Sequence, residues 1–183
     1  LYHVVDMNAN GGAGKVTERM KPMLENVDLF PAGMMACRHA NGKDWWLLKQ
    51  GGDSTLGNVV YKFLFKQDTV LNMGMQVLPY PFKGYLWNFT QYAISQDGSK
   101  WAASITSAST EGEVFLADFD RCTGILSNYS KINIMPFMNL PNGPTISDSV
   151  NLGVCFSPNG QFLYVSRYHH VVQYNLQTGS QYK

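Results

Sequence analysis

The sequence predicts an all-β fold made of repeated four-stranded antiparallel units. An apolar run, an Asn-Gly or Asp-Gly turn and a second apolar run recur three times in the 183 residues, with turn glycines at Gly42, Gly98 and Gly160. The runs are short and rich in β-branched and aromatic residues, as strands are. The glycines lie 56 and 62 residues apart. A hairpin that recurs at such a long period indicates stacked β units of the kind that build a β-propeller.

Each unit continues beyond its hairpin with a third apolar segment, a further turn and, in two units, a fourth apolar segment at residues 69–78 and 125–135. Four antiparallel strands make one propeller blade. Because Asn-Gly and Asp-Gly favour the type I′ turn, we expect that turn in each hairpin. We assign blades to residues 34–78 and 91–137, and an incomplete last blade, which stops after its third strand, to residues 152–183.

Residues 1–24 match the end of a preceding blade, with a third strand at 1–6 and a fourth at 15–23 around a Gly-rich loop. Residues 1–183 then form a single propeller segment of about three blades plus a half, which is a partial ring. Propellers close with roughly four to eight blades, and open sheet edges promote aggregation. We expect the ring to be closed by the rest of a longer chain or by a second copy.

Composition excludes several classes of partner. Charged residues make up 15% of the chain and the net charge is +1, with no basic stripe for nucleic acid. No apolar run approaches the roughly 18 residues that span a bilayer. Cys37 and Cys155 each lie five residues before a turn glycine, where Ala93 stands in the middle unit. We therefore expect buried structural thiols at these positions.

One loop resembles the start of a calcium site. Asp6, Asn8 and Asn10, followed by Gly11, have the spacing of the first ligands of an EF-hand loop. The pattern then fails, because Thr17 stands where the twelfth-position glutamate is needed. The alternative is a hairpin loop in which Asn and Gly supply positive φ. Apart from this possible calcium loop, no cofactor is expected.

No catalytic motif stands out, and an enzymatic role is the less favoured interpretation. Gly-x-Ser-x-Gly is absent, and the polar candidates Asp6, His39, Asp97 and His169 lie at different places in their units. Two connecting loops instead carry aromatic and sulfur side chains beside several prolines, and such loops make good contact surfaces. The alternative is that they only cap the gaps between blades. The candidate partner-binding residues are Tyr80, Phe82, Tyr85, Trp87, Phe137 and Met138.

The segment Phe156-Ser157-Pro158-Asn159-Gly160, between two apolar runs, resembles the strand pair of WD40-like and YVTN-type propellers. Residues 119–124 and 174–179 look like the blade ends that follow this pair. Together with the N-terminal loop, the chain is similar to secreted propeller proteins of Bacteroidetes-type bacteria that carry a type IX sorting domain. The middle unit lacks the Phe and Pro of the motif, the first lacks Ser-Pro, and no Trp-Asp dipeptide is present.

The resemblance implies a secreted or cell-surface protein. The favoured function is a non-catalytic, extracytoplasmic module that recognises a protein or a glycan or acts as a scaffold. An alternative is a hydrolase, because YVTN-like propellers resemble lactonase scaffolds in which loops on one face gather the catalytic groups. A further alternative is a sensor ectodomain.

Overall fold

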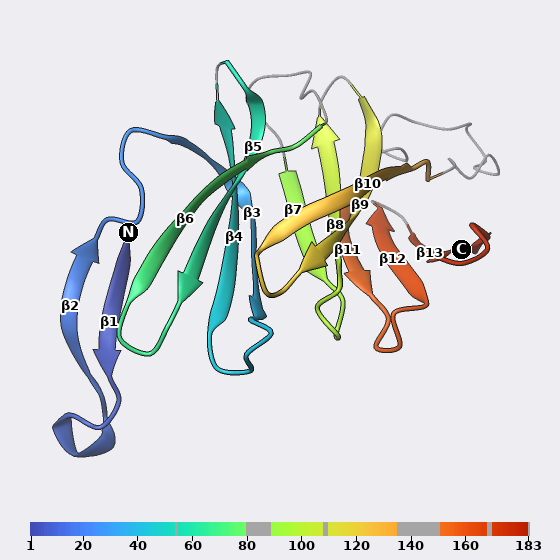
Figure 1. Cartoon of the computed structure of the whole chain (residues 1–183). Coiled ribbons are helices and arrows are strands. Elements are labelled where there is room, and N and C mark those ends of the chain that lie inside the picture. The colour runs from blue at the N-terminus through green and yellow to red at the C-terminus, as the bar shows by residue number, and fades with distance from the viewer. Residues whose placement is uncertain (54, 80–88, 108–109, 135–150, 168–169, 183) are drawn as a thin grey trace.

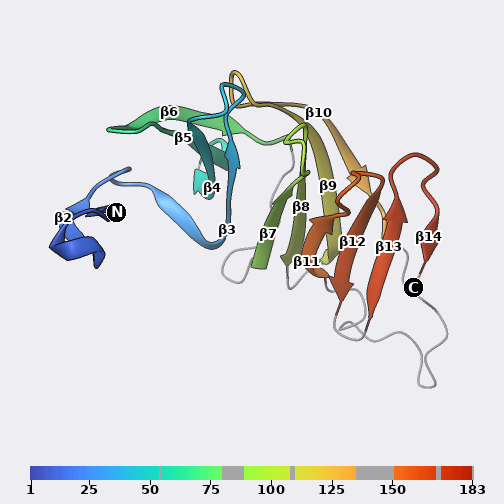
Figure 2. The same cartoon turned by 90° about the horizontal axis from the view of Figure 1, so that it is seen from below.

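The computed structural model describes residues 1–53, 55–79, 89–107, 110–134, 151–167 and 170–182. Three four-stranded antiparallel sheets follow one another along the chain, after an N-terminal two-stranded hairpin (Figure 1). In each large sheet, every strand pairs with the next in sequence. The sheets stand side by side as an open fan (Figure 2). The fold is therefore all-β, an open, partial ring of propeller blades, as the sequence predicts.

The strand bounds define the blades. The N-terminal hairpin contains β1 (Tyr2–Asp6) and β2 (Lys15–Lys21), with a short 3₁₀ turn, η1 (Asn10–Gly12), between them. Blade 1 contains β3 (Asp28–Arg38), β4 (Trp45–Asp53), β5 (Gly57–Phe65) and β6 (Val70–Val77). Blade 2 contains β7 (Phe89–Ile94), β8 (Lys100–Ser107), β9 (Thr110–Asp120) and β10 (Ile125–Ile132). Blade 3 contains β11 (Asn151–Phe156), β12 (Phe162–Arg167), β13 (Val171–Asn175) and β14 (Gln181–Tyr182).

The last blade corrects one prediction. The sequence predicts that it stops after its third strand, but Gln181 and Tyr182 pair with β13 as a short fourth strand. The reversal comes from the turn after β13. Asn175 accepts a hydrogen bond from the Gly179 amide at 2.9 Å, and Gly179 has a φ of 72°. A left-handed glycine ends the turn and sends the chain back along β13.

The three repeated hairpin turns are built alike, but they are not of type I′. In each, the glycine amide donates to a carbonyl three residues earlier: Gly42 to His39, Gly98 to Ser95 and Gly160 to Ser157. The glycines have φ between 68° and 75°, whereas the Asn or Asp before each does not have positive φ. A type I′ turn needs positive φ at both central residues. The prediction is wrong because side-chain hydrogen bonds, such as Ser95 Oγ to Asp97 at 2.6 Å, hold a different turn.

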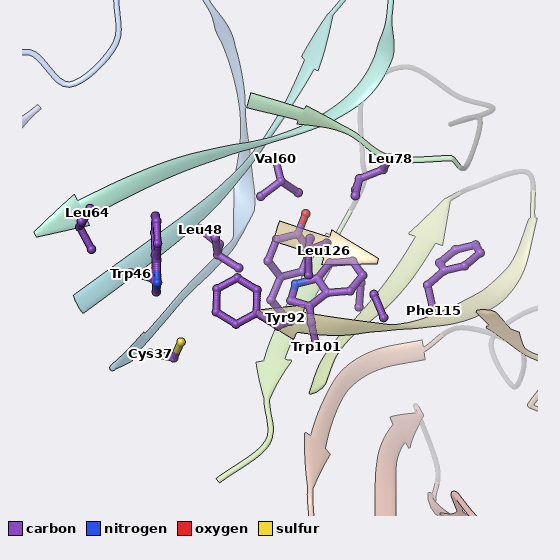
Figure 3. Close-up of a cluster of buried hydrophobic side chains, with 13 residues drawn as sticks. Cys37, Trp46, Leu48, Val60, Leu64, Leu78, Tyr92, Trp101, Phe115 and Leu126 are labelled. Carbon is purple, nitrogen blue, oxygen red and sulfur yellow. The ribbon is translucent and has the colours of Figure 1, made fainter. Parts of the chain in front are cut away.

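Two of the three hydrophobic clusters in the described residues lie between blades, and the third lies on blade 1. Trp46 and Leu48 of blade 1 face Tyr92 and Trp101 of blade 2 in one cluster (Figure 3). A second cluster joins blade 2 to blade 3 through Ala93, Ala102, Val154 and Leu163, among others. Such apolar burial contributes roughly 25 cal/mol per Å². The packing of each blade on the next therefore stabilises the arc.

The two cysteines expected to be buried differ. Cys37 lies in the core between blades 1 and 2, but Cys155 is exposed. Both occupy the same place in their blades, on the face that looks toward the following blade. Cys155 is exposed because, among the described residues, no blade follows blade 3. The prediction of a buried thiol is confirmed for Cys37 and wrong for Cys155.

A glutamine joins the outer strands of two blades. The Gln76 side-chain amide in β6 donates to the Leu126 carbonyl at 2.5 Å and accepts from the Leu126 amide at 3.1 Å. It also donates to the Tyr129 hydroxyl at 2.8 Å. The Gln76 side chain thus pairs with the backbone amide and carbonyl of Leu126 as a neighbouring strand would. Leaving these two buried groups without partners would cost free energy.

Candidate functional site

The candidate site is a groove of about 230 Å³ between the inner strands of blades 1 and 2. Its walls come from residues 35–38 at the end of β3, from Trp45, from the turn after β7 and from Arg121 in the turn after β9. We call it the β3–β7 groove. Met35, Ala36 and Ile94 make it partly apolar, and two arginines reach it from different blades.

The turn after β9 is anchored firmly to blade 1, which places Arg121 in the groove. The Arg121 carbonyl accepts hydrogen bonds from the Ala40 amide at 3.2 Å and from Trp46 Nε1 at 2.8 Å. The Arg121 side chain lies over Gly98, where a Cβ would come within 2.3 Å of its Cδ. The guanidinium position therefore depends on contacts to both blades.

The second arginine, Arg38, is placed by an aromatic ring. Its guanidinium carbon lies 5.3 Å from the centroid of the Trp45 ring, within the range of a cation–π interaction. In the part of the chain that the structure describes, the ion pairs are Lys21–Glu18, Lys100–Asp118 and Lys131–Glu113. Neither arginine of the groove is among them. The groove thus holds two guanidinium groups that form no ion pair with a described carboxylate, although Arg121 lies close enough to Asp97 to help lower the pKa of that carboxyl.

Two titratable groups beside the arginines keep fixed charge states near neutral pH. Burial raises the pKa of the Cys37 thiol to about 11, so it stays protonated and apolar. Hydrogen bonds from Ser95 and Ser99 lower the pKa of Asp97 to about 2. Asp97 is therefore ionised, and its oxygens already accept from the Ser95 hydroxyl, the Ser99 amide and the Ser99 hydroxyl. It braces the turn that carries the groove wall.

Two of the other candidate catalytic residues, His39 and Asp6, also make hydrogen bonds that hold turns. His39 Nδ1 accepts the Asn41 amide at 3.0 Å, so Nε2 carries the proton and donates to the Cys122 carbonyl at 3.1 Å. Nδ1 thus braces the hairpin turn of blade 1, and Nε2 joins that turn to blade 2. Asp6 is in the N-terminal hairpin, where Oδ1 accepts the Asn8 amide at 2.9 Å. His169 lies outside the described residues.

The possible calcium loop forms the tip of the N-terminal hairpin. Asp6 ends β1, and Asn10 and Gly11 have φ of 57° and 65°. Left-handed Asn and Gly are the usual means of making such a tight loop. No three His, Cys, Asp or Glu side chains gather for a metal anywhere in the described ranges. Calcium binding through Asp6, Asn8 and Asn10 stays a prediction.

The predicted partner-binding residues cannot be placed. Tyr80, Phe82, Tyr85 and Trp87 fall in 80–88, and Phe137 and Met138 fall in 135–150, which are outside the described residues. The sequence interpretation missed Arg38 and Arg121, although it identified the turn at 119–124 as a blade end. A signal was available, because the blade-end turn of one propeller unit can be expected to pack against the hairpin turn of the unit before it.

The chain is an open arc of β-propeller blades. No protein-family model and no curated protein matches its sequence. Among solved structures it is similar to the C-terminal WD40 domain of Sif2, with a TM-score of 0.48 and 14% identity over 86% of this chain and 37% of that chain. It is also similar to Kuenenia stuttgartiensis hydrazine synthase, with a TM-score of 0.41 and 12% identity over 90% of this chain and 48% of that chain. The chain thus spans less than half the length of either structure. No helix in the described residues is long and apolar enough to cross a membrane.

Proposed function

We propose that the chain is a non-catalytic recognition module that binds a protein segment in the β3–β7 groove and holds a carboxylate of that segment between Arg38 and Arg121. The observation that carries this proposal is the pair of guanidinium groups on a partly apolar hollow, without a carboxylate in direct contact. Guanidinium groups match carboxylates in a bidentate geometry, which favours arginine where such groups are recognised.

The apolar walls support a peptide rather than a free anion. Met35, Ala36 and Ile94 would contact an apolar side chain next to the carboxylate, and the neutral Cys37 side chain also lines the groove. A small inorganic anion would use the charges but not these walls. The residues predicted from the sequence would add to the contact surface in this proposal; they are Tyr80, Phe82, Tyr85, Trp87, Phe137 and Met138. A glycan contacting those aromatic residues is the competing ligand class.

The non-catalytic part of the proposal rests on the polar side chains near the groove. His39 uses both ring nitrogens in fixed hydrogen bonds, and Asp97 is held ionised by three donors. A general base needs a free acceptor within reach of a substrate proton; His39 offers none, and the lowered pKa of Asp97 makes it a weak base. A secreted or cell-surface location belongs to the same proposal and is supported by the resemblance of the Phe156–Gly160 strand pair alone.

The test uses two fluorescein-labelled peptides of the same sequence, in which one position flanked by leucines is Glu in the first peptide and Gln in the second. Charge-assisted hydrogen bonds contribute about 1.5–3 kcal/mol, so the Glu peptide should bind about 10- to 150-fold more tightly at low salt. The double variant Arg38→Gln, Arg121→Gln should lose that preference. Lys15→Gln with Lys43→Gln removes the same charge at exposed positions outside the groove and should keep it. Equal affinities of the two peptides, or no binding of either, would contradict the proposal.

A further inference from the structure

The side of blade 1 that looks away from blade 2 is a second surface, which meets the groove at Arg38 and Trp45. Residues paired directly across an antiparallel ladder share one face of the sheet. The pairing of β3 through β6 therefore places a set of apolar side chains together on this side, which we call the first-blade face. Its half-buried or exposed members are Leu29, Met34, Trp45, Leu47, Met75 and Val77.

This face has the construction of the two blade-docking faces already seen in the chain. Trp45, Trp101 and Leu163 are equivalent positions in the three blades. In each hairpin turn the first amide donates to a carbonyl, of Asp44, Lys100 or Phe162, and the residue in question comes directly after it. Trp101 and Leu163 are 0% exposed, each covered by the preceding blade, whereas Trp45 is 45% exposed. Two residues further on, Ala103 and Val165 are buried, and Leu47 is half-buried. The first-blade face is thus equivalent to two surfaces that a neighbouring blade covers.

Part of the face is already covered by the chain itself. Met23, Leu24 and Val27, in the link between the hairpin and blade 1, pack on a β5 cluster that includes Tyr61 and Phe63. The inner part, along β3 and β4, is open, with Met34 62% exposed and Trp45 45% exposed. A complete four-stranded blade would have to displace the link. Two strands laid over β3 and β4 would leave it in place.

The N-terminal hairpin supplies the other half of such a blade. It lies on the same side of blade 1 as the first-blade face (Figure 2). Within the described residues β1 pairs with β2 alone, so its other edge carries backbone amides and carbonyls without a ladder partner. An unpaired edge of this kind accepts an added strand. In each complete blade, the first two strands form an inner hairpin and the last two form the outer pair. The hairpin of β1 and β2 corresponds to an outer pair, so the part that it lacks is an inner hairpin.

We propose that a two-stranded β-hairpin from outside residues 1–183 completes this blade, pairing with the free edge of β1 and covering Trp45 with alternate apolar side chains. The chain contains an example of the required chemistry. The β3–β4 hairpin places Cys37, Trp46 and Leu48 on the cluster that buries Trp101. The occupant presents the same kind of face to Trp45. This face shares Trp45 with the groove, but the two proposals are tested with different ligands, the Glu and Gln peptides for the groove and a hairpin peptide for the face, so either proposal can fail without the other.

The experiment offers the protein a peptide that copies residues 33–51, the β3–β4 hairpin, and measures binding by calorimetry. A matched peptide carries Trp46→Ser and Leu48→Ser. Because an isolated hairpin is only marginally ordered in water, both are also fused ahead of Leu1 through a Gly-Ser linker. The first peptide should bind at least ten-fold more tightly than the second, and its fusion should raise Tm. Hydrogen exchange should slow across residues 2–6.

Variants of the protein locate the contact. Trp45→Glu should abolish binding of the peptide, and Trp45→Phe should retain it. Val171→Glu is the control, because Val171 is an exposed apolar residue at the other end of the arc, 52% exposed. Equal binding of the two peptides, unchanged exchange in β1, or no effect of either free peptide or fusion would overturn the proposal. A stable dimer of the protein alone that Trp45→Glu dissociates would instead assign the face to a second copy.

Discussion

Replacing Gly124 with alanine should loosen the joint between blades 1 and 2. Gly124 has a φ of 70° and closes the turn after β9. A Cβ there would lie 2.7 Å from Cη2, 2.8 Å from Cζ3 and 2.9 Å from Cζ2 of Trp46. The Trp46 ring is 1% exposed, and Nε1 donates to the Arg121 carbonyl at 2.8 Å. The ring therefore cannot move aside without losing a buried hydrogen bond or opening the core.

The loss of unfolding free energy in Gly124→Ala has two parts, a backbone part and a steric part, and Gly179→Ala is a control in which only the backbone part is expected. A left-handed alanine costs about 1–2 kcal/mol, and an added methyl in a packed core costs about 1–3 kcal/mol. Gly124→Ala should therefore lose about 2–5 kcal/mol of unfolding free energy. Gly179 closes the same turn in blade 3 with a φ of 72°, and the nearest atom to its Cβ would be the Tyr174 hydroxyl at 3.4 Å. Gly179→Ala should lose only about 1–2 kcal/mol, the left-handed part.

Thermal unfolding followed by far-UV circular dichroism measures the difference. For a chain of this size about 1 kcal/mol shifts Tm by roughly 2–4 °C, so the ranges are about 2–8 °C for Gly179→Ala and about 4–20 °C for Gly124→Ala. Urea midpoints should rank the variants in the same order. The Trp46 indole proton should also shift in Gly124→Ala alone. Equal losses of stability in the two variants would refute the argument, because they would show that Trp46 does not restrict the turn.

Two further predictions concern titratable groups near the groove. Because burial raises the pKa of Cys37 to about 11, a thiol reagent at pH 8 should modify the exposed Cys122 and Cys155 rapidly and Cys37 only on unfolding; mass spectrometry of peptides reads this directly, and rapid labelling of Cys37 would contradict it. Hydrogen bonds from Ser95 and Ser99 lower the pKa of Asp97 from 3.8 to about 2, so its contribution to stability is present above about pH 4 and is lost as the pH falls toward 2. Asp97→Asn should remove that part of the pH dependence in urea titrations, whereas an unchanged acid profile would show that another group is responsible.

The sequence predicts the repeat well because the repeat is local. The turn glycines Gly42, Gly98 and Gly160 mark equivalent turns in the structure, all with positive φ. The Asn-Gly or Asp-Gly dipeptide alone does not determine the type of turn. In the second and third turns, the serine hydroxyl that holds the turn lies two residues before the Asp or Asn. The Ser157 hydroxyl donates to Asn159 at 2.7 Å and repeats the Ser95–Asp97 contact. The Phe-Ser-Pro-Asn-Gly pattern therefore describes a side-chain-braced turn.

The groove is harder to predict because its parts are distant in sequence. Arg38 ends β3 and Arg121 follows β9, and they share a wall only because the turn after β9 docks on the hairpin turn of blade 1. That docking depends on His39, whose ring reaches the Cys122 carbonyl 83 residues away. The sequence pattern within one blade does not predict a contact between two blades. Aligning the blades and asking which turns meet would have placed both arginines together.

The two ends of the arc show what a repeat pattern does and does not determine. The alternation within a strand decides which side chains share a face, and this is equally true of Trp45 and Trp101, or of Cys155 and Cys37. Whether the face is buried depends on a neighbouring blade, which lies outside the unit being examined. A ligand that binds only the folded arc and covers Trp45 must stabilise it by mass action, by about 2.7 kcal/mol at a hundred times its dissociation constant. The stability of blade 1 is therefore coupled to its occupant, and the groove, which shares Arg38 and Trp45 with that face, should become more rigid when the face is covered.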